Sequence, residues 1–189
     1  MNQFENVQDL EVWLTENGID TTTWGVQGTK SVQNLWDELV NGDAQLQLEP
    51  PLRQVWVTEV FIQRAGHILI ELEQAFGNGD TRSRRRVPSE KMYAGETCET
   101  AALRCLQEEL EAPKDAITFL SPAQERAKQL KESPSYPGLQ TQYIFYRIAV
   151  DVQGLPVEDF WRNNQAFAHG DPVKRHHWAW IKQADYQEG

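Results

Sequence analysis

Hydrophobic residues recur at helical spacing in the first part of the chain. The segment 7–18 places four apolar side chains on one helical face, namely Val7, Leu10, Trp13 and Leu14. The segment 31–42 does the same with Val32, Leu35, Trp36, Leu39 and Val40. Ser31 can cap the second helix, and an Asn-Gly pair ends each segment. We therefore predict a helical N-terminal extension of residues 1–43, packed on a main domain of residues 44–189.

Beyond residue 50 the pattern changes to short runs rich in β-branched and aromatic residues. Runs at 52–63 and 67–76 predict two strands joined by a short turn. In the second run, apolar positions alternate with positions that include Glu71 and Glu73, which predicts a strand with one buried face.

Three more strands are predicted in the second half of the chain, at 116–120, 139–152 and 176–181. Residues 124–138 are polar, and we expect them to form a connection without a strand. Strands followed by a helix and more strands predict an α+β fold with a mixed sheet.

A loop at 87–96 leads into a predicted helix at 97–110. Thr97 can cap this helix, and an apolar stripe follows it, formed by Ala102, Leu103, Leu106 and Leu110. Cys105, Glu108 and Glu109 share another face, because residues three and four apart are neighbours on a helix. An acidic face beside a glycine loop suits Mg²⁺ or Mn²⁺, which favour oxygen ligands.

Residues 88–110, PSEKMYAGETCETAALRCLQEEL, resemble the signature of the Nudix superfamily, which hydrolyses nucleoside diphosphates linked to another moiety. The matching positions are Pro88, Gly95, Glu96, Ala101, Ala102, Arg104, Leu106, Glu108 and Glu109. The departures are Ser89 and Glu90 for the paired glycines, Tyr93 for a glutamate, Glu111 for the last glycine, and Cys105. The family has a metal-binding glutamate at the position of Cys105.

The resemblance implies a Nudix-like α+β fold, with a mixed sheet sandwiched between helices, and metal-dependent hydrolysis of a pyrophosphate bond in a nucleotide-like substrate. It implies that Glu108 and Glu109 bind Mg²⁺ or Mn²⁺, assisted by Glu96 and Glu90, while Arg104 orients the acids. A thiol is a soft ligand for a hard cation, so Cys105 should lower the affinity for Mg²⁺. The carboxylate of Glu90 or Glu96 could take the vacant position.

Two further groups of residues could serve such a reaction. A basic run could bind phosphate through its guanidinium groups, and it consists of Arg82, Arg84, Arg85 and Arg86. The alternative is a solvated basic loop or strand edge. Asp171 is a candidate catalytic base or metal ligand, with a turn-forming role before Pro172 as the alternative. We expect Trp178 and Trp180 to form a buried aromatic pair rather than a base-stacking platform.

Two other functions fit parts of the sequence. The first is a Nudix-like fold that has lost hydrolysis and binds a nucleotide or a protein partner. Cys105 favours this function, while the retained Arg104, Glu108 and Glu109 argue against it. The second is an unrelated α+β domain whose acidic helix matches the signature by coincidence.

Composition narrows the choice of partners and compartment. The 189 residues carry a formal net charge of −10, which disfavours general binding to nucleic acids and anionic membranes. The sequence has no apolar run of spanning length and no signal-peptide pattern at its start, so we expect a cytoplasmic protein.

In a helix, Cys98 and Cys105 would lie roughly 10 Å apart, too far for a disulfide. The N-terminal helices, with Trp13 and Trp36, could form a homodimer contact.

Overall fold

The computed structural model describes residues 4–26 and 28–187, and the chain divides into two compact units. The first unit comprises Met1–Val57, Lys91–Glu96 and Arg126–Phe145, and the second comprises Thr58–Glu90, Thr97–Glu125 and Tyr146–Gly189. Each unit has its own hydrophobic core. The described residues form α-helices and a large sheet, which confirms the predicted α+β class. The proposed division at residues 43 and 44 stays a prediction.

The first unit contains the two N-terminal helices, which confirms both of them. α1 spans Val7–Glu16 and α2 spans Val32–Asn41. Asn6 and Ser31 cap them by accepting hydrogen bonds from backbone amides in the first turns. The unit also holds β1 (Gln45–Gln47), the first part of β2 (Leu52–Arg64), most of β7 (Gln124–Ser133) and the first part of β8 (Tyr136–Val152).

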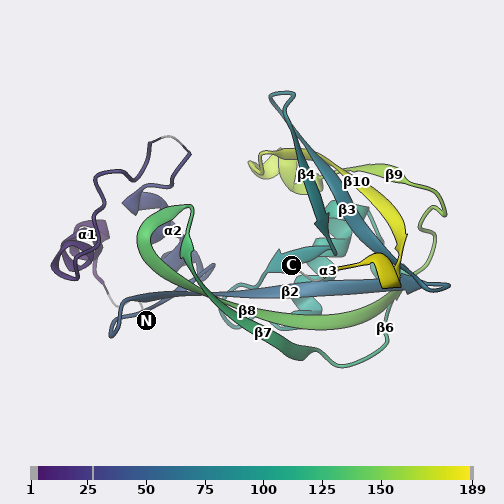
Figure 1. The fold of residues 1–189 in the computed structure, drawn as a ribbon, viewed down its shortest axis with the longest axis horizontal. Coiled ribbons are helices and arrows are strands. Elements are labelled where there is room, and N and C mark those ends of the chain that lie inside the picture. Colours follow the sequence, from purple (N-terminus) through teal and green to yellow (C-terminus); the bar gives the residue numbers. More distant parts are fainter. Residues whose placement is uncertain (1–3, 27, 188–189) are drawn as a thin grey trace. The chain divides into compact units, whose positions relative to one another are not determined.

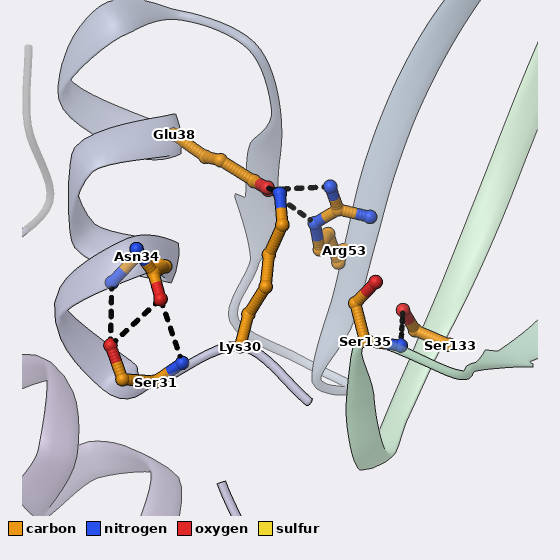
Figure 2. A network of polar contacts seen from close by, with 7 residues as sticks. All are labelled: Lys30, Ser31, Asn34, Glu38, Arg53, Ser133 and Ser135. Atoms are coloured by element: carbon orange, nitrogen blue, oxygen red, sulfur yellow. Dashed lines mark hydrogen bonds and ion pairs between the residues drawn. The ribbon is translucent and has the colours of Figure 1, made fainter. Parts of the chain in front are cut away.

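A buried ion network joins α2 to β2 within the first unit (Figure 2). Glu38 is only 6% exposed, and its carboxylate lies 2.5 Å from Arg53 Nη2 and 2.6 Å from Lys30 Nζ. Burial alone would raise the pKa of Glu38, but Arg53 and Lys30 together hold it below its ordinary value. The network therefore keeps a charged carboxylate inside the unit.

In the second unit the strands follow the order β6-β8-β2-β3-β10-β9, with β4 added beside β3. The bounds are His67–Phe76 for β3, Thr81–Arg86 for β4, Ile117–Phe119 for β6, Phe160–Asn163 for β9 and Val173–Lys182 for β10. β3 pairs antiparallel with β2, β4 and β10, so it lies inside the sheet (Figure 1). The helix α3, Cys98–Leu110, belongs to the same unit.

The prediction that β3 has one buried face was wrong. Its residues from Ile68 to Glu71 are all buried, because separate hydrophobic clusters cover its two faces. Leu69 belongs to the cluster that contains α3 side chains, whereas Ile68 and Ile70 pack with Phe61 and Val87. The buried acid Glu71 in this strand becomes important below.

The polar segment 124–138 is also different from the prediction. Residues Gln124–Ser133 form β7, which pairs with β8. Most of its side chains are exposed or half-buried, so the strand needs no apolar alternation, and its backbone hydrogen bonds come from the neighbouring strand. The expected loop at 87–96 likewise contains a short strand, β5 (Ser89–Lys91), which pairs with β2.

Both cysteines are free and buried, which confirms the prediction that they do not pair. Trp178 is fully buried, as expected, whereas Trp180 is only partly buried against the same cluster. In the described part of the chain, no helix is both long and apolar enough to cross a membrane.

Candidate active site

The helix α3 carries the residues of the Nudix-like signature, and its capping follows from the sequence. Thr97 accepts a hydrogen bond from Thr100 N at 3.2 Å, and Glu111 ends the helix in the left-handed conformation. The buried row of the helix consists of Cys98, Ala101, Ala102, Cys105, Leu106 and Leu110. The predicted apolar stripe was therefore partly wrong, because Leu103 is only half-buried.

Cys105 lies in this buried row and not on an exposed acidic face. Its exposed fraction is 0%, and it packs in the cluster with Leu106 and Trp178. Burial raises the pKa of the Cys105 thiol well above its ordinary value, and the nearby carboxylates of Glu109 and Glu90 raise it further. A thiol that stays protonated is neither a nucleophile nor a metal ligand. Cys105 is thus a small core residue.

The charges of three other acids act on Glu109, and we call the four residues the acid cluster: Glu71, Glu90, Glu109 and Asp171. Burial raises the pKa of Glu109 well above its ordinary value, and the charges of Glu71, Glu90 and Asp171 raise it further. Glu109 lies on α3, Glu71 on β3, Glu90 on β5 and Asp171 in the turn before β10. Like charges held together in a half-buried place favour the uptake of a proton or a cation.

Two arginines lie against the acid cluster. Arg84 Nε is 3.2 Å from Glu71 Oε2, and Arg104 Nη1 is 3.0 Å from Glu90 Oε1. The positive charge of Arg84 also lowers the pKa of Glu109. The sequence predicted Arg104 as the residue that orients the acids, and its ion pair with Glu90 places it among them.

Glu71 and His176 are site residues that the sequence analysis missed. His176 Nδ1 lies 2.5 Å from Glu71 Oε1, and the two residues are 2% and 3% exposed. One signal in the sequence could have identified Glu71, because it is an acid inside the apolar run HILIELEQAF. An acid in such a run is expected to be buried, and a buried carboxylate needs a partner. His176 carried no such signal beyond its place in a predicted strand.

The predicted arginine run forms β4 and lines a concave region of roughly 860 Å³, which we call the arginine hollow. Its lining residues are Arg82, Ser83, Arg84, Arg85, Arg86, Asp185, Tyr186 and Gln187. Arg82 is held in place, since its Nε donates to Gln74 Oε1 at 3.1 Å and its guanidinium lies over the Phe76 ring. Arg84 belongs both to the hollow and to the surroundings of the acid cluster.

The remaining predicted residues are placed as follows. Asp171 is exposed, and its Oδ1 accepts a hydrogen bond from Val173 N at 2.7 Å, as a turn-forming residue does. Glu108 is half-buried on α3. Glu96 lies in the first unit, where its Oε2 accepts a hydrogen bond from Tyr93 N at 2.9 Å.

The acid cluster suits a divalent cation in its chemistry and its charge. Carboxylate oxygens are the ligands that Mg²⁺ and Mn²⁺ prefer, and mutual repulsion among the acids would be relieved by a cation. Within residues 4–26 and 28–187, no group of three or more His, Cys, Asp or Glu side chains converges closely enough to hold a metal. Arginines meet two of the four acids, so in this arrangement the counter-charge comes from the chain itself.

Comparison with known proteins gives matches only among solved structures. No protein-family model matches the sequence, and the search of curated proteins gives no match. The E. coli ORF135 protein is 19% identical, with 68% of this chain and 74% of that chain covered and a TM-score of 0.36. A C. elegans Ap4A hydrolase in a binary complex is 15% identical, with 70% of this chain and 81% of that chain covered and a TM-score of 0.36. The MutT protein from Bacillus halodurans is 15% identical, with 69% of this chain and 70% of that chain covered and a TM-score of 0.38. Likenesses at these TM-scores do not assign the chain to a family.

Proposed function

We propose that the protein is a Nudix-like hydrolase, dependent on Mg²⁺ or Mn²⁺, that cleaves a pyrophosphate bond in a nucleoside diphosphate-linked substrate. The observation that carries this proposal is the set of acids, Glu71, Glu90 and Asp171, whose charges act on Glu109 in the unit that also holds an arginine-lined hollow. Acids that hold a cation, next to guanidinium groups that hold phosphate, are what hydrolysis of a pyrophosphate requires. The nucleotide-like nature of the substrate rests on the sequence signature.

The acids have separate parts in this proposal. Glu109 and Glu108 on α3 would hold the cation, with Glu90 in the position that Cys105 cannot serve. Glu96 stays a prediction drawn from the sequence signature alone. A bound divalent cation polarises a phosphoryl oxygen and lowers the pKa of its water. Arg104 holds the Glu90 carboxylate through their 3.0 Å ion pair, so it orients a ligand.

The basic residues would bind and position the substrate. Arg82, Arg85 and Arg86 are exposed along β4, and their guanidinium forks match phosphate oxygens in geometry and charge. Asp171 is the candidate base. Its Oδ1 accepts a hydrogen bond from the Val173 amide, which limits the orientations of the carboxylate.

The test is phosphate release from a panel of nucleotides and nucleotide conjugates, with Mg²⁺ and separately with Mn²⁺. Wild type is compared with a Glu108→Gln/Glu109→Gln double variant, after both are shown to be folded by circular dichroism. The control is Glu99→Gln, which removes one negative charge from the first turn of the same helix. We expect turnover in wild type and in the control, and its loss in the double variant.

The same panel separates hydrolysis from the alternative function. Binding of a nucleotide by folded wild type, without turnover of any substrate in the presence of either metal, would replace the proposed hydrolase with a binding protein. Equal turnover by wild type and the double variant would mean that the acid cluster is not the catalytic centre. Membrane association and general nucleic-acid binding are not part of the proposal, and a homodimer stays a prediction.

A further inference from the structure

We infer that Tyr186 gives the arginine hollow a stacking surface for the base of a nucleotide, so that the hollow binds a nucleoside diphosphate group and not phosphates alone. This inference rests on the proposed function and deepens it, because it assigns a residue to recognition of the nucleoside. The sequence analysis did not select Tyr186. The structure brings it to the hollow from the segment that follows the short helix η3 (Gln183–Asp185).

The ring of Tyr186 is held in place by a hydrophobic cluster and by backbone hydrogen bonds. It lies nearly perpendicular to the Phe61 ring, at 81°, with the ring centres 6.1 Å apart. The same cluster contains Val87, the residue directly after β4. Tyr186 N donates to Gln183 O at 3.2 Å, and Gln183 N donates to Gly66 O at 3.0 Å. The ring is therefore positioned near the end of β4 before a ligand arrives, which lowers the entropic cost of stacking on it.

The position of Tyr186 also exposes part of its ring to the hollow. Tyr186 is half-buried, and it is one of the residues that line the hollow. A tyrosine in such a place offers a ligand a flat apolar surface, and bases of every kind stack on aromatic rings. The hollow, at roughly 860 Å³, falls in the range of about 300–1,000 Å³ that is usual for small-molecule sites. It is large enough for a nucleotide.

The charges that line the hollow differ between its two sides. β4 supplies its four arginines, whereas the segment after β10 supplies Asp185 and Tyr186. Phosphate oxygens are attracted to guanidinium groups and repelled by the Asp185 carboxylate. A nucleotide is therefore oriented with its phosphates on β4 and its base against Tyr186.

The test is a calorimetric titration of metal-free protein, in a chelator, with ADP, GDP and methyl diphosphate. Methyl diphosphate carries the same phosphate groups without a nucleoside. Wild type is compared with Tyr186→Leu, which removes the flat ring and keeps an apolar side chain for the cluster. We expect Tyr186→Leu to bind both nucleotides about tenfold more weakly than wild type, because a stacked base contributes about that much. Its binding of methyl diphosphate should be unchanged.

Two further variants separate stacking from charge. Tyr186→Phe keeps the ring and should bind all three ligands as wild type does. Arg85→Gln removes a guanidinium group from the opposite side of the hollow, and it should weaken the binding of ADP and of methyl diphosphate by the same factor. An equal loss of ADP and methyl diphosphate binding in folded Tyr186→Leu would overturn the inference.

Wild type alone provides a second test, which does not depend on the folding of Tyr186→Leu. It should bind ADP more tightly than methyl diphosphate, and equal affinities, or no binding of ADP, would overturn the inference. A base preference that Tyr186→Leu loses, without hydrolysis by wild type in Mg²⁺ or Mn²⁺, would overturn the proposed function and leave the inference standing. Hydrolysis of nucleotides by wild type and Tyr186→Leu with the same KM would overturn the inference and leave the proposed function standing.

Discussion

His176 Nδ1 lies 2.5 Å from Glu71 Oε1, and the two side chains are among the least exposed polar groups of the second unit. This contact joins β10 to β3 and places one oxygen of Glu71 against the imidazole. The other oxygen faces Arg84. A buried carboxylate with these two partners holds Arg84 at the edge of the acid cluster.

Replacing Glu71 by Gln should destabilise the protein strongly. The change leaves Arg84 and His176 without their common carboxylate, and breaking a buried charge pair costs about 3–5 kcal/mol. Urea unfolding followed by tryptophan fluorescence measures the loss. The control is Glu73→Gln on the same strand, where a half-buried acid is replaced and a much smaller effect is expected. Equal stabilities of the two variants would contradict the role of Glu71.

The raised pKa of Glu109 predicts how stability depends on pH without metal. Folding raises the pKa of this carboxyl group above its ordinary value of 4.5, so the folded protein keeps a proton that the unfolded chain releases. Stability is therefore greatest below that value and falls as the pH rises through the folded pKa. Glu109→Gln removes this loss and should melt at a higher temperature than wild type at about pH 8, with a smaller difference at about pH 5.

Thermal melting at the two pH values, in the presence of a chelator, checks this prediction. One kcal/mol corresponds to about 2–4 °C in a chain of this length, so the difference is measurable. A glutamine variant that melts at the same temperature as wild type at both pH values would show that Glu109 is not under electrostatic strain.

Placing the glutamate of the Nudix signature at position 105, by Cys105→Glu, should not create a working metal site. Cys105 is 0% exposed and lies near Glu109 and Glu90, so the new carboxylate would be buried among acids. We expect a loss of stability of several kcal/mol, roughly 3 or more, partly recovered when Mn²⁺ is added. Cys105→Ala, which removes only the thiol, is the control and should cost about 1 kcal/mol. Unchanged stability of Cys105→Glu without metal would mean that position 105 reaches solvent.

The buried network of the first unit predicts an acid-sensitive contribution to stability. Arg53 and Lys30 hold the pKa of Glu38 in the folded protein below its ordinary value of 4.5. The ionised Glu38 therefore stabilises the folded protein above that value, and this stabilisation is lost as the pH falls through the folded pKa. Glu38→Gln should lower the melting temperature at neutral pH and show a weaker dependence on acid than wild type. Glu49→Gln, a neighbouring acid outside this network, serves as the control. Parallel acid profiles for wild type and Glu38→Gln would contradict this assignment.

Much of the fold could be predicted from local patterns. The helices at Val7–Glu16, Val32–Asn41 and Cys98–Leu110 have regular apolar spacing and capping residues, and both signals are local. The strand β7 was missed because it is polar on both sides, and only its pairing with β8 makes it a strand. The burial of both faces of β3 likewise depends on what packs there, which the sequence of β3 does not contain.

The candidate site could be predicted only in part, for a related reason. Glu109, Glu90 and Arg104 were found because a signature fixes their spacing along the chain. Glu71 and His176 come from two strands 105 positions apart, and only the sheet brings them together. Cys105 was placed on the acidic face by helical spacing, but the packing against Trp178 turns that side of the helix into core.

The most direct measurement of the central claim is the rate of phosphate release from the best substrate of the panel as Mg²⁺ or Mn²⁺ is added to metal-free protein. The account predicts a rate that rises to saturation with metal in wild type and in Glu99→Gln, and that is about 100-fold lower in Glu109→Gln. Turnover by Glu109→Gln equal to that of wild type, or turnover that persists in a chelator, would contradict the proposal that the acid cluster around Glu109 is a metal-dependent catalytic centre.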